Sequence, residues 1–257
     1  MKMLRSGFIL YSAVIFIGLY GRAQNATFIS QGKIEYERKD NLYDQFKDLD
    51  WDDGGTFSDI MKKGMPKFKL TYYDLSFSKT ITLFKPGREN HDNDKMLDWF
   101  SQQPGESNII YCNLQSQQST SQKSVYGSPY LVQDSTRRIR WKITDETRTI
   151  AGFQCRRANA MIMDSVYVVA FYTDEIITSG GPESFSGLPG MILGLALPHQ
   201  HITWFATKVE AVSVTNASLI PPSKGKHVTY AGLKEILTER MKEEKKWGRR
   251  ILLYTLI

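Results

Sequence analysis

The sequence has few of the residues from which recognisable active sites are built. Only two cysteines and four histidines occur among its 257 residues. It contains no Gly-x-Ser-x-Gly, His-Glu-x-x-His, phosphate-binding loop or Gly-x-Gly-x-x-Gly pattern, which mark hydrolases, zinc peptidases and nucleotide-binding sites. We therefore predict a protein that is not an enzyme. A hydrolase whose site is assembled from residues far apart in the sequence stays open as an alternative.

The apolar segment at the start of the chain is too short to cross a membrane. Lys2 and Arg5 precede an apolar run at 8–19 and small residues at 21–23. About a dozen apolar residues are fewer than the roughly 20 that span a bilayer, and the pattern is typical of a secretory signal peptide. We expect residues 1–23 to be removed, which leaves a single soluble β-rich domain over 24–257. An uncleaved anchor is the alternative.

The excess of charge of one sign is small. The formal net charge is +6, but Lys2, Arg5 and Arg22 lie in the predicted signal peptide, so the remainder carries +3. Basic residues cluster at 137–140 and 242–250 with acidic residues interspersed along the chain, which is typical of solvated faces. We expect no nucleic-acid partner.

Cysteine usage leaves two alternatives open. Cys112 and Cys155 are the only cysteines, and export would place them in a compartment where a disulfide between them can form. Two buried free thiols are an equally ordinary outcome, because cysteine packs as a small hydrophobic residue.

Strand signals dominate the chain. Short segments rich in β-branched and aromatic residues are separated by Gly, Pro, Asp, Asn or Ser clusters, at 33–38, 67–73, 79–84, 108–114, 139–143, 153–163, 165–172, 191–197 and 202–214. This spacing favours antiparallel pairing, with hairpins inside 143–150 and over 158–172. We predict a mainly β fold, a curved antiparallel sheet or partly open barrel with a C-terminal amphipathic helix.

Helical signal is strong only over 230–247, where apolar residues recur near helical spacing. We expect this helix to cover the sheet; binding to a partner or a membrane surface is the alternative. A weaker helical signal lies at 45–61. The segment 251–257 is predicted to be a final strand, and the polar segments 86–99 and 101–128 are predicted to contain long loops.

Glycine and proline crowd one stretch, 180–195, which reads GGPESFSGLPGMILGL. Because glycine permits positive φ and proline fixes φ, this density specifies one backbone path into the strand at 191–197. The stretch resembles the signature of the GLPGLI family. Segments 32–37, 141–158 and 168–176 match that family's pattern in the expected order, with mild departures at Phe153, Phe171 and Met191.

The resemblance implies an exported protein of Bacteroidetes-type bacteria, in a family whose biochemical role is not established. Such proteins are often encoded beside outer-membrane TonB-dependent transporters. The resemblance therefore implies a periplasmic, secreted or outer-membrane-associated binding protein of the cell envelope. Its partner would be a TonB-dependent transporter or another envelope protein, and its role would be uptake or metal handling. The alternative is a carrier of a small apolar ligand in the concavity of the sheet, lined by Phe171, Tyr172, Met191 and Trp204.

The glycine-rich stretch has two interpretations. Loops on rigid scaffolds often contact ligands or partners, which makes a candidate surface of Phe185, Gly187, Leu188, Pro189, Gly190 and Met191. The structural interpretation is that the glycines let another element approach the backbone closely.

His199 and His201 are candidate metal ligands. In extended backbone their side chains would lie on one face, about 6.5 to 7 Å apart. With a third ligand from Cys155, His227 or a carboxylate they would suit Zn or Cu. The alternative is a polar turn. The acidic stretch 48–59 has part of the spacing of a calcium loop, but its glycine is one place late, and we interpret it as an acidic surface loop.

Overall fold

The computed structural model describes residues 28–47, 66–90, 105–125, 127–240 and 252–257. The predicted signal peptide and the acidic stretch 48–59 lie outside these ranges. The strands are β1 (Gly32–Asn41), β2 (Phe68–Phe77), β3 (Ile81–Pro86), β4 (Ile109–Asn113), β5 (Gln118–Val125), β6 (Ser128–Ser135), β7 (Lys142–Ile150), β8 (Phe153–Ile162), β9 (Val166–Thr173), β10 (Met191–Leu197), β11 (Ile202–Glu210) and β12 (Lys226–Val228). The helices are α1 (Leu42–Lys47) and α3 (Tyr230–Arg240), with 3-10 turns η2 (Pro198–Gln200) and η3 (Asn216–Ser218) and a helical turn at 252–256.

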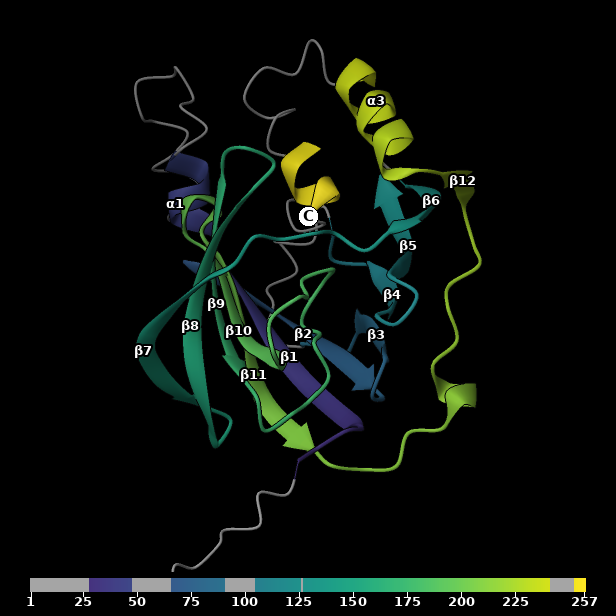
Figure 1. Ribbon diagram of the computed structural model, residues 1–257. Helices are drawn as coiled ribbons and strands as arrows, with labels where there is room; N and C mark the ends of the chain where they lie inside the picture. Colours follow the sequence, from purple (N-terminus) through teal and green to yellow (C-terminus); the bar gives the residue numbers. More distant parts are fainter. Residues whose placement is uncertain (1–27, 48–65, 91–104, 126, 241–251) are drawn as a thin grey trace, which may run out of the picture.

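The strands form one sheet in the order β12-β6-β5-β4-β3-β2-β1-β11-β10-β9-β8-β7. Neighbours pair antiparallel except β12 and β6, which are parallel. The sheet is strongly curved, and the segment 136–141 crosses in front of the curve to join β6 to β7 (Figure 1). The predicted mainly β fold is confirmed, as a mixed sheet that is not closed into a barrel. No helix in the described ranges is long and apolar enough to span a membrane.

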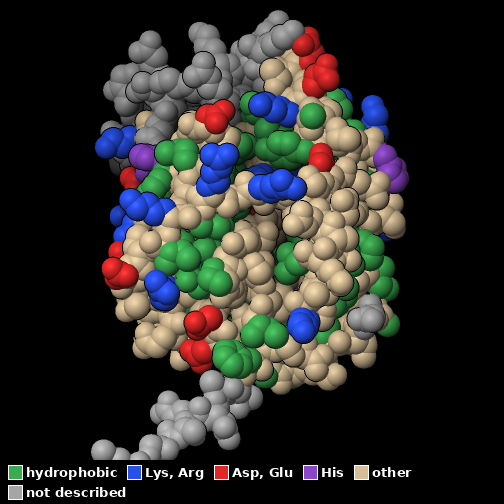
Figure 2. Space-filling model, in the orientation of Figure 1, with side chains coloured by type: hydrophobic (Ala, Val, Ile, Leu, Met, Phe, Trp, Pro, Cys, Tyr) green, Lys and Arg blue, Asp and Glu red, His purple; other side chains and the backbone are tan. Residues whose placement is uncertain are grey.

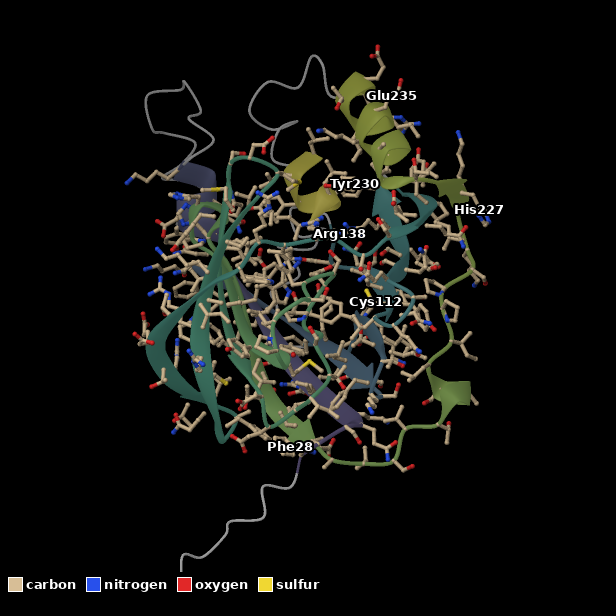
Figure 3. All side chains as sticks on the ribbon, in the orientation of Figure 1. Phe28, Cys112, Arg138, His227, Tyr230 and Glu235 are labelled. Carbon is tan, nitrogen blue, oxygen red and sulfur yellow. The ribbon has the colours of Figure 1, made fainter. Side chains whose placement is uncertain are left out.

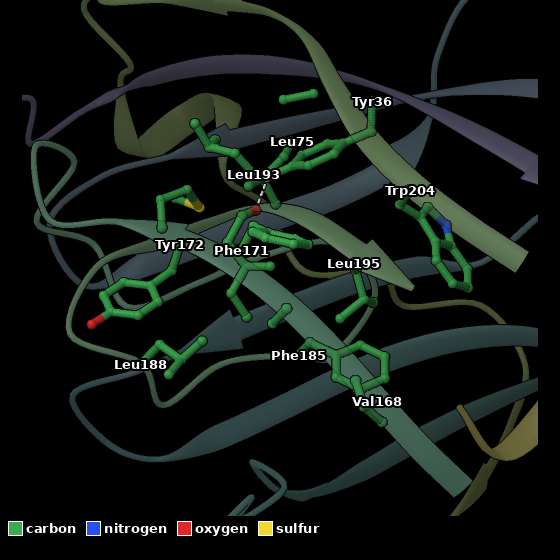
Figure 4. Packing of buried hydrophobic residues seen from close by; sticks show 14 of the residues in the cluster. Tyr36, Leu75, Val168, Phe171, Tyr172, Phe185, Leu188, Leu193, Leu195 and Trp204 are labelled. Atoms are coloured by element: carbon green, nitrogen blue, oxygen red, sulfur yellow. Dashed lines mark hydrogen bonds between the residues drawn. The ribbon is translucent and has the colours of Figure 1, made fainter. Parts of the chain in front are cut away.

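Buried and more exposed residues alternate along the strands, so the sheet has one buried face and one more exposed face. In β1 every second residue is buried, and these residues are Gly32, Ile34, Tyr36, Arg38 and Asp40. Successive side chains of a strand point to opposite faces, so these residues share the inner face of the curve. The main core lies there and combines β1 to β4, β8 to β11 and the loop before β10 (Figure 4). The inner face is apolar over most of its area but charged toward the Asn41 end of β1.

Two smaller apolar clusters cover other parts of the sheet. Leu233 and Leu237 of α3 pack against β5 and β6, as the amphipathic pattern at 230–247 predicts. Val214 and Leu219, from the segment between β11 and β12, pack on Leu83 of β3. The described helix ends at Arg240, and residues 241–247 lie outside the described ranges.

The two predicted hairpins have different outcomes. β8 and β9 form the one expected over 158–172, through Met163 and Asp164, whose φ angles of 47° and 60° are typical of a type I′ turn. The hairpin predicted inside 143–150 is wrong, because β7 runs unbroken through it with a register irregularity against β8. The reversal lies instead at Ala151 and Gly152, both with positive φ.

Four other predicted segments differ from the structure or are only partly described. β4 confirms the strand expected at 108–114, whereas β5 lies in the expected polar loop 101–128 and is held by pairing with β4 and β6 despite its polar sequence. The expected strand 139–143 begins only at Lys142. The prediction of a final strand at 251–257 is wrong: residues 252–256 form a helical turn with a hydrogen bond from Ile257 N to Leu253 O, and side chains bind the main-chain oxygens of residues 255–257. Of the helix expected at 45–61, only α1 lies in the described part.

Candidate functional site

The glycine-rich loop lies mostly inside the curve of the sheet. Phe185, Leu188 and Met191 are 1%, 2% and 0% exposed, and Gly190 is also buried. Figure 4 shows Phe185 and Leu188 packed among other core side chains. Of the six residues of the candidate surface, only Gly187 and Pro189 are exposed. The apolar side chains of this loop are therefore core residues in the structure.

Close approach of neighbouring atoms to the backbone requires glycine at several positions of this stretch, Gly190 and Gly194 among them. At Gly190, where φ is 144°, an added Cβ would lie 2.0 Å from the carbonyl oxygen of Thr173. At Gly194 an added Cβ would lie 2.7 Å from Cε1 of Phe205 and 2.9 Å from Cδ1 of Ile150. Neither distance is compatible with a side chain unless its surroundings move. These two glycines thus serve the packing of β9, β10, β11 and the end of β7.

Hydrogen bonds hold the backbone of this stretch. β10 is irregular against β9 between Ile192 and Gly194, and the buried hydroxyl of Tyr36 donates to the carbonyl of Ile192 at 2.6 Å. Burial raises the pKa of Tyr36 well above its ordinary value, so the hydroxyl remains protonated and able to donate. Two further donors to the loop are Ser179 Oγ, 2.6 Å from Leu188 O, and Trp141 Nε1, 2.9 Å from Ser186 O.

The histidines do not have the geometry on which the metal prediction rests. His199 lies within the 3-10 turn η2 and His201 caps it with a left-handed φ of 57°, so the backbone is not extended. His199 is exposed and His201 half-buried. Within the described ranges, no group of three or more His, Cys, Asp or Glu side chains is placed to hold a metal ion. The position corresponds to the polar turn that the sequence left as the alternative.

The cysteines are both free and buried, Cys112 on β4 and Cys155 on β8. The disulfide considered from the sequence is not formed in the structure. Burial raises the pKa of both thiols, that of Cys155 to about 12. Both cysteines belong to the main core. The residues proposed to line an apolar ligand cavity are packed in that core too, with Phe171, Tyr172 and Trp204 at most 7% exposed.

The most unusual feature of the interior is a region that we call the polar end. It comprises Arg38, Asp40, Lys69, Thr71, Tyr73, Glu106, Asn108, Lys123, Arg137, Glu183 and Trp204, most of them buried. Strand register assembles its centre. Arg38 of β1 pairs with Thr71 of β2 and with Trp204 of β11. Asp40, two residues further along β1, pairs with Lys69 of β2.

Arg38 and Asp40 form a buried, two-pronged ion pair at the centre of the polar end. Nε and Nη2 of Arg38 donate to the two carboxylate oxygens of Asp40, each at 2.9 Å, and the side chains are 2% and 0% exposed. The guanidinium also lies 5.3 Å from the centre of the Trp204 ring. Burial acts to lower the pKa of Arg38, but Asp40 and other nearby groups raise it well above its ordinary value. The guanidinium is therefore a fixed positive charge inside the protein.

Three polar atoms beside Arg38 have no hydrogen-bond partner in the described part of the chain. They are Thr71 Oγ1, Tyr73 Oη and Trp204 Nε1, and all three are buried. The whole Tyr73 and Trp204 residues are 0% and 2% exposed. An unpaired buried polar group costs about 1–3 kcal/mol, and most such groups in folded proteins have a partner. Three of the six such side-chain atoms among the described residues thus lie on the inner face near Arg38.

Two other pairings extend the polar end. Lys69 Nζ and Glu106 Oε1 form an ion pair at 2.6 Å, and Asn108 Nδ2 donates to Glu183 Oε2 at 3.1 Å. Burial raises the pKa of both glutamates, against the opposing effect of nearby cations. Glu183 also has a φ of 53°, a left-handed conformation that non-glycine residues seldom adopt.

Lys123, on β5, faces the same region. It is 6% exposed, and burial lowers its pKa to about 8, while the nearby Glu183 partly counteracts this and Arg137 adds to it. Arg137 belongs to the crossing segment 136–141, and the next residue of that segment, Arg138, is exposed (Figure 3). Lys and Arg side chains also gather on the outer surface of this face (Figure 2).

The polar end was missed from the sequence, although one signal was present. Arg38 and Asp40 occupy the same alternating positions of β1 as the buried Ile34 and Tyr36. Charged residues in phase with buried apolar ones indicate charges on the inner face of a sheet. Nothing in the sequence indicates which residues of other strands they meet.

Comparisons with known proteins identify the fold but not a function. A family model described as a protein of unknown function, Porph_ging, matches residues 160–194, from β8 into β10. The match includes most of the glycine-rich stretch but is to a family of another name, so the resemblance to the GLPGLI family stays a prediction. No curated protein matches this chain.

Among solved structures, two crystal forms of PNGF-II are similar to this chain. One has 15% sequence identity and a TM-score of 0.49 over 77% of this chain, and the other has 14% identity and a TM-score of 0.50 over 80% of it. In both cases 32% of the PNGF-II chain is covered, so this chain spans about a third of its length. At this level of identity the likeness concerns the fold alone.

Proposed function

We propose that this protein is a non-enzymatic binding protein that holds a small carboxylate-bearing ligand at the polar end. The observation that carries the proposal is the set of three unpaired polar atoms, on Thr71, Tyr73 and Trp204, around the guanidinium of Arg38. The indole N–H can only donate, and the two hydroxyls can donate as well. A ligand rich in acceptors would satisfy all three at once.

The charge balance of the polar end favours an anionic ligand. Four cationic side chains, Arg38, Lys69, Lys123 and Arg137, face three carboxyl groups, Asp40, Glu106 and Glu183. A carboxylate would therefore enter a region of net positive potential in which it is shielded from water.

Substitutions at the unpaired atoms distinguish a ligand site from a structural cluster. Tyr73→Phe removes an unpaired hydroxyl without changing the charge or the ring, so the unliganded protein should keep its stability or gain some. Trp204→Phe removes the indole N–H but also leaves a cavity in the core, so its melting temperature without ligand should be lower than that of the wild type, and only the increase on adding ligand is compared. The matched control is Tyr72→Phe, on the same strand, whose hydroxyl contacts Glu37. We would record melting temperatures with a panel of small mono- and dicarboxylates and with the corresponding neutral amides.

The proposal predicts that at least one carboxylate raises the melting temperature of the wild type and of Tyr72→Phe, and that its amide does not. The increase should be lost in Tyr73→Phe and in Trp204→Phe. An increase that survives in both variants, or none for any member of the panel, would contradict the proposal.

The cellular setting proposed here rests on the sequence. We place the protein in the periplasm or at the outer membrane, with a TonB-dependent transporter or another envelope protein as its partner. The predicted signal peptide, the GLPGLI resemblance and the Porph_ging match at 160–194 support this. Cell fractionation followed by crosslinking in intact cells tests it, and recovery of the mature chain in the cytoplasmic fraction would contradict it. Metal handling receives no support from the position of His199 and His201.

A hydrolase is a second candidate, favoured by one observation. The pKa of Lys123 is lowered and that of the neighbouring Glu183 is raised, and such perturbed pairs are frequent at sites of proton transfer. Activity toward ester, amide and glycoside substrates that is present in the wild type and lost in Glu183→Gln would replace the binding proposal with this one.

A further inference from the structure

The helical turn at 252–256 is held by side chains that bind its backbone. Lys123 Nζ donates to Thr255 O at 2.8 Å, Arg137 Nη2 to Leu256 O at 2.5 Å, and Ser184 Oγ to Ile257 O at 3.1 Å. These donors come from β5, the crossing segment 136–141 and the glycine-rich loop. Three consecutive carbonyl groups are thus bound by side chains from three separate parts of the chain.

Cationic donors at this position suit a carbonyl-rich end of a peptide. The last carbonyl groups of a helical turn have no partner within the turn and carry partial negative charge. Lys123 and Arg137 supply the opposite charge, and one further nitrogen, Arg137 Nη1, is buried without a partner among the described residues. The site is therefore not fully used by the segment that now occupies it.

Apolar contacts fix the side chains of the same segment. Tyr254 and Ile257 are 6% and 4% exposed in the main core, and Leu256 is 3% exposed in the cluster formed by β5, β6 and α3. The Tyr254 hydroxyl also donates to Gln200 O at 2.8 Å. The turn lies at the mouth of the curved sheet (Figure 1).

We propose that Lys123, Arg137 and Ser184 form a recognition site for a short apolar peptide, which the segment 252–257 fills in cis. The site binds consecutive main-chain oxygens through cationic and hydroxyl donors, and the apolar clusters on either side of it contact the apolar side chains of the peptide. It shares Lys123 and Arg137 with the polar end, but its contacts are to main-chain oxygens of the segment 252–257, and none of the unpaired atoms of Thr71, Tyr73 and Trp204 takes part in it. A peptide of the same chemistry binds when the internal segment is displaced.

The test uses the whole chain and a labelled peptide with the sequence of residues 252–257, Leu-Leu-Tyr-Thr-Leu-Ile, with an amidated end. Two variants weaken the internal segment. Tyr254→Ala removes an aromatic anchor, and Leu256→Lys adds a cation beside Lys123 and Arg137. Circular dichroism and a cooperative thermal transition establish that each variant is folded, and fluorescence anisotropy measures binding.

The wild type should bind the peptide at least about tenfold more weakly than the variants, because its own segment competes at an effective concentration in the millimolar range. Adding Lys123→Ala to either variant should weaken peptide binding about tenfold or more, since a hydrogen bond to a charged donor is lost. Adding the exposed Lys85→Ala should leave binding unchanged. Absence of binding to folded Tyr254→Ala or Leu256→Lys, or binding insensitive to Lys123→Ala, overturns the proposal.

The wild type provides a measurement that does not depend on the variants. Millimolar unlabelled peptide should increase hydrogen exchange at the amides of residues 252–257, while a peptide of the same length in which every second residue is replaced by aspartate should not. Unchanged exchange at saturating peptide overturns the proposal.

Discussion

Replacing Lys123 by methionine should change how the stability of the protein depends on pH. Burial lowers the pKa of Lys123 from its ordinary value of 10.5 to about 8, so the folded protein releases this proton more readily than the unfolded chain does. Between these two values the unfolded chain binds more protons, and stability therefore rises with pH. This gain in stability is absent below the pKa of Lys123 in the folded protein and complete above its pKa in the unfolded chain.

The size of the effect follows from that difference. A pKa unit corresponds to about 1.4 kcal/mol, so the full gain is about 3 kcal/mol, of which about 2 kcal/mol falls between about pH 7 and about pH 9.5. Other groups, including tyrosines with raised pKa values, titrate in both proteins and cancel in the comparison. Methionine has a similar length and no charge.

The assay is urea unfolding of the wild type and Lys123→Met at several pH values, followed by circular dichroism. The free energy of unfolding of the wild type should increase relative to that of the variant as the pH rises. If the free energy of unfolding of the wild type stays constant relative to that of the variant, or falls relative to it as the pH rises, the conclusion that this lysine is buried at a cost in its charged form is refuted.

Three further predictions concern the core. Gly194→Ala should lower the free energy of unfolding by about 1–3 kcal/mol, because the added methyl group overpacks the core. The control, Gly232→Ala in α3, should be neutral or slightly stabilising. Chemical denaturation of both variants measures the two changes, and equal stability of the two variants would contradict the prediction. Tyr36→Phe should cost about 1–3 kcal/mol by leaving a buried carbonyl unpaired, and an unchanged denaturation midpoint would contradict this. Cys112 and Cys155 should react with a thiol reagent only after unfolding and without prior reduction; a count of no free thiols in the denatured, unreduced protein would contradict the structure.

Strands that bury apolar side chains could be predicted from the sequence. β10 was expected over 191–197 and has these bounds, because an apolar run bounded by glycine and proline leaves little choice of structure. The hairpin of β8 and β9 could be predicted because strand-forming segments lie on both sides of the turn residue Asp164. β5 could not be predicted in this way, since it reads QSTSQKSV and contains a single apolar residue, Val125. Its strand structure depends on hydrogen bonding to β4 and β6.

The candidate site could not be predicted either, and the physical reason is a different one. Arg38, Lys69, Lys123, Glu183 and Trp204 come from five separate segments, and each looks like a surface residue or an ordinary core residue in its own segment. Pairing between strands distant in the sequence brings them together on the inner face. A local pattern carries no information about such pairing. The glycine-rich stretch, in contrast, was visible in the sequence because its constraints are local.

The central claim is that the polar end binds a carboxylate. The most direct measurement is the electron density beside Tyr73 and Trp204 in a crystal of the wild-type protein soaked with the carboxylate that raises its melting temperature most. The account predicts carboxylate oxygens within hydrogen-bond distance of Tyr73 Oη and Trp204 Nε1, next to Arg38. Density for water alone at these atoms, with the carboxylate bound elsewhere or not at all, would contradict it.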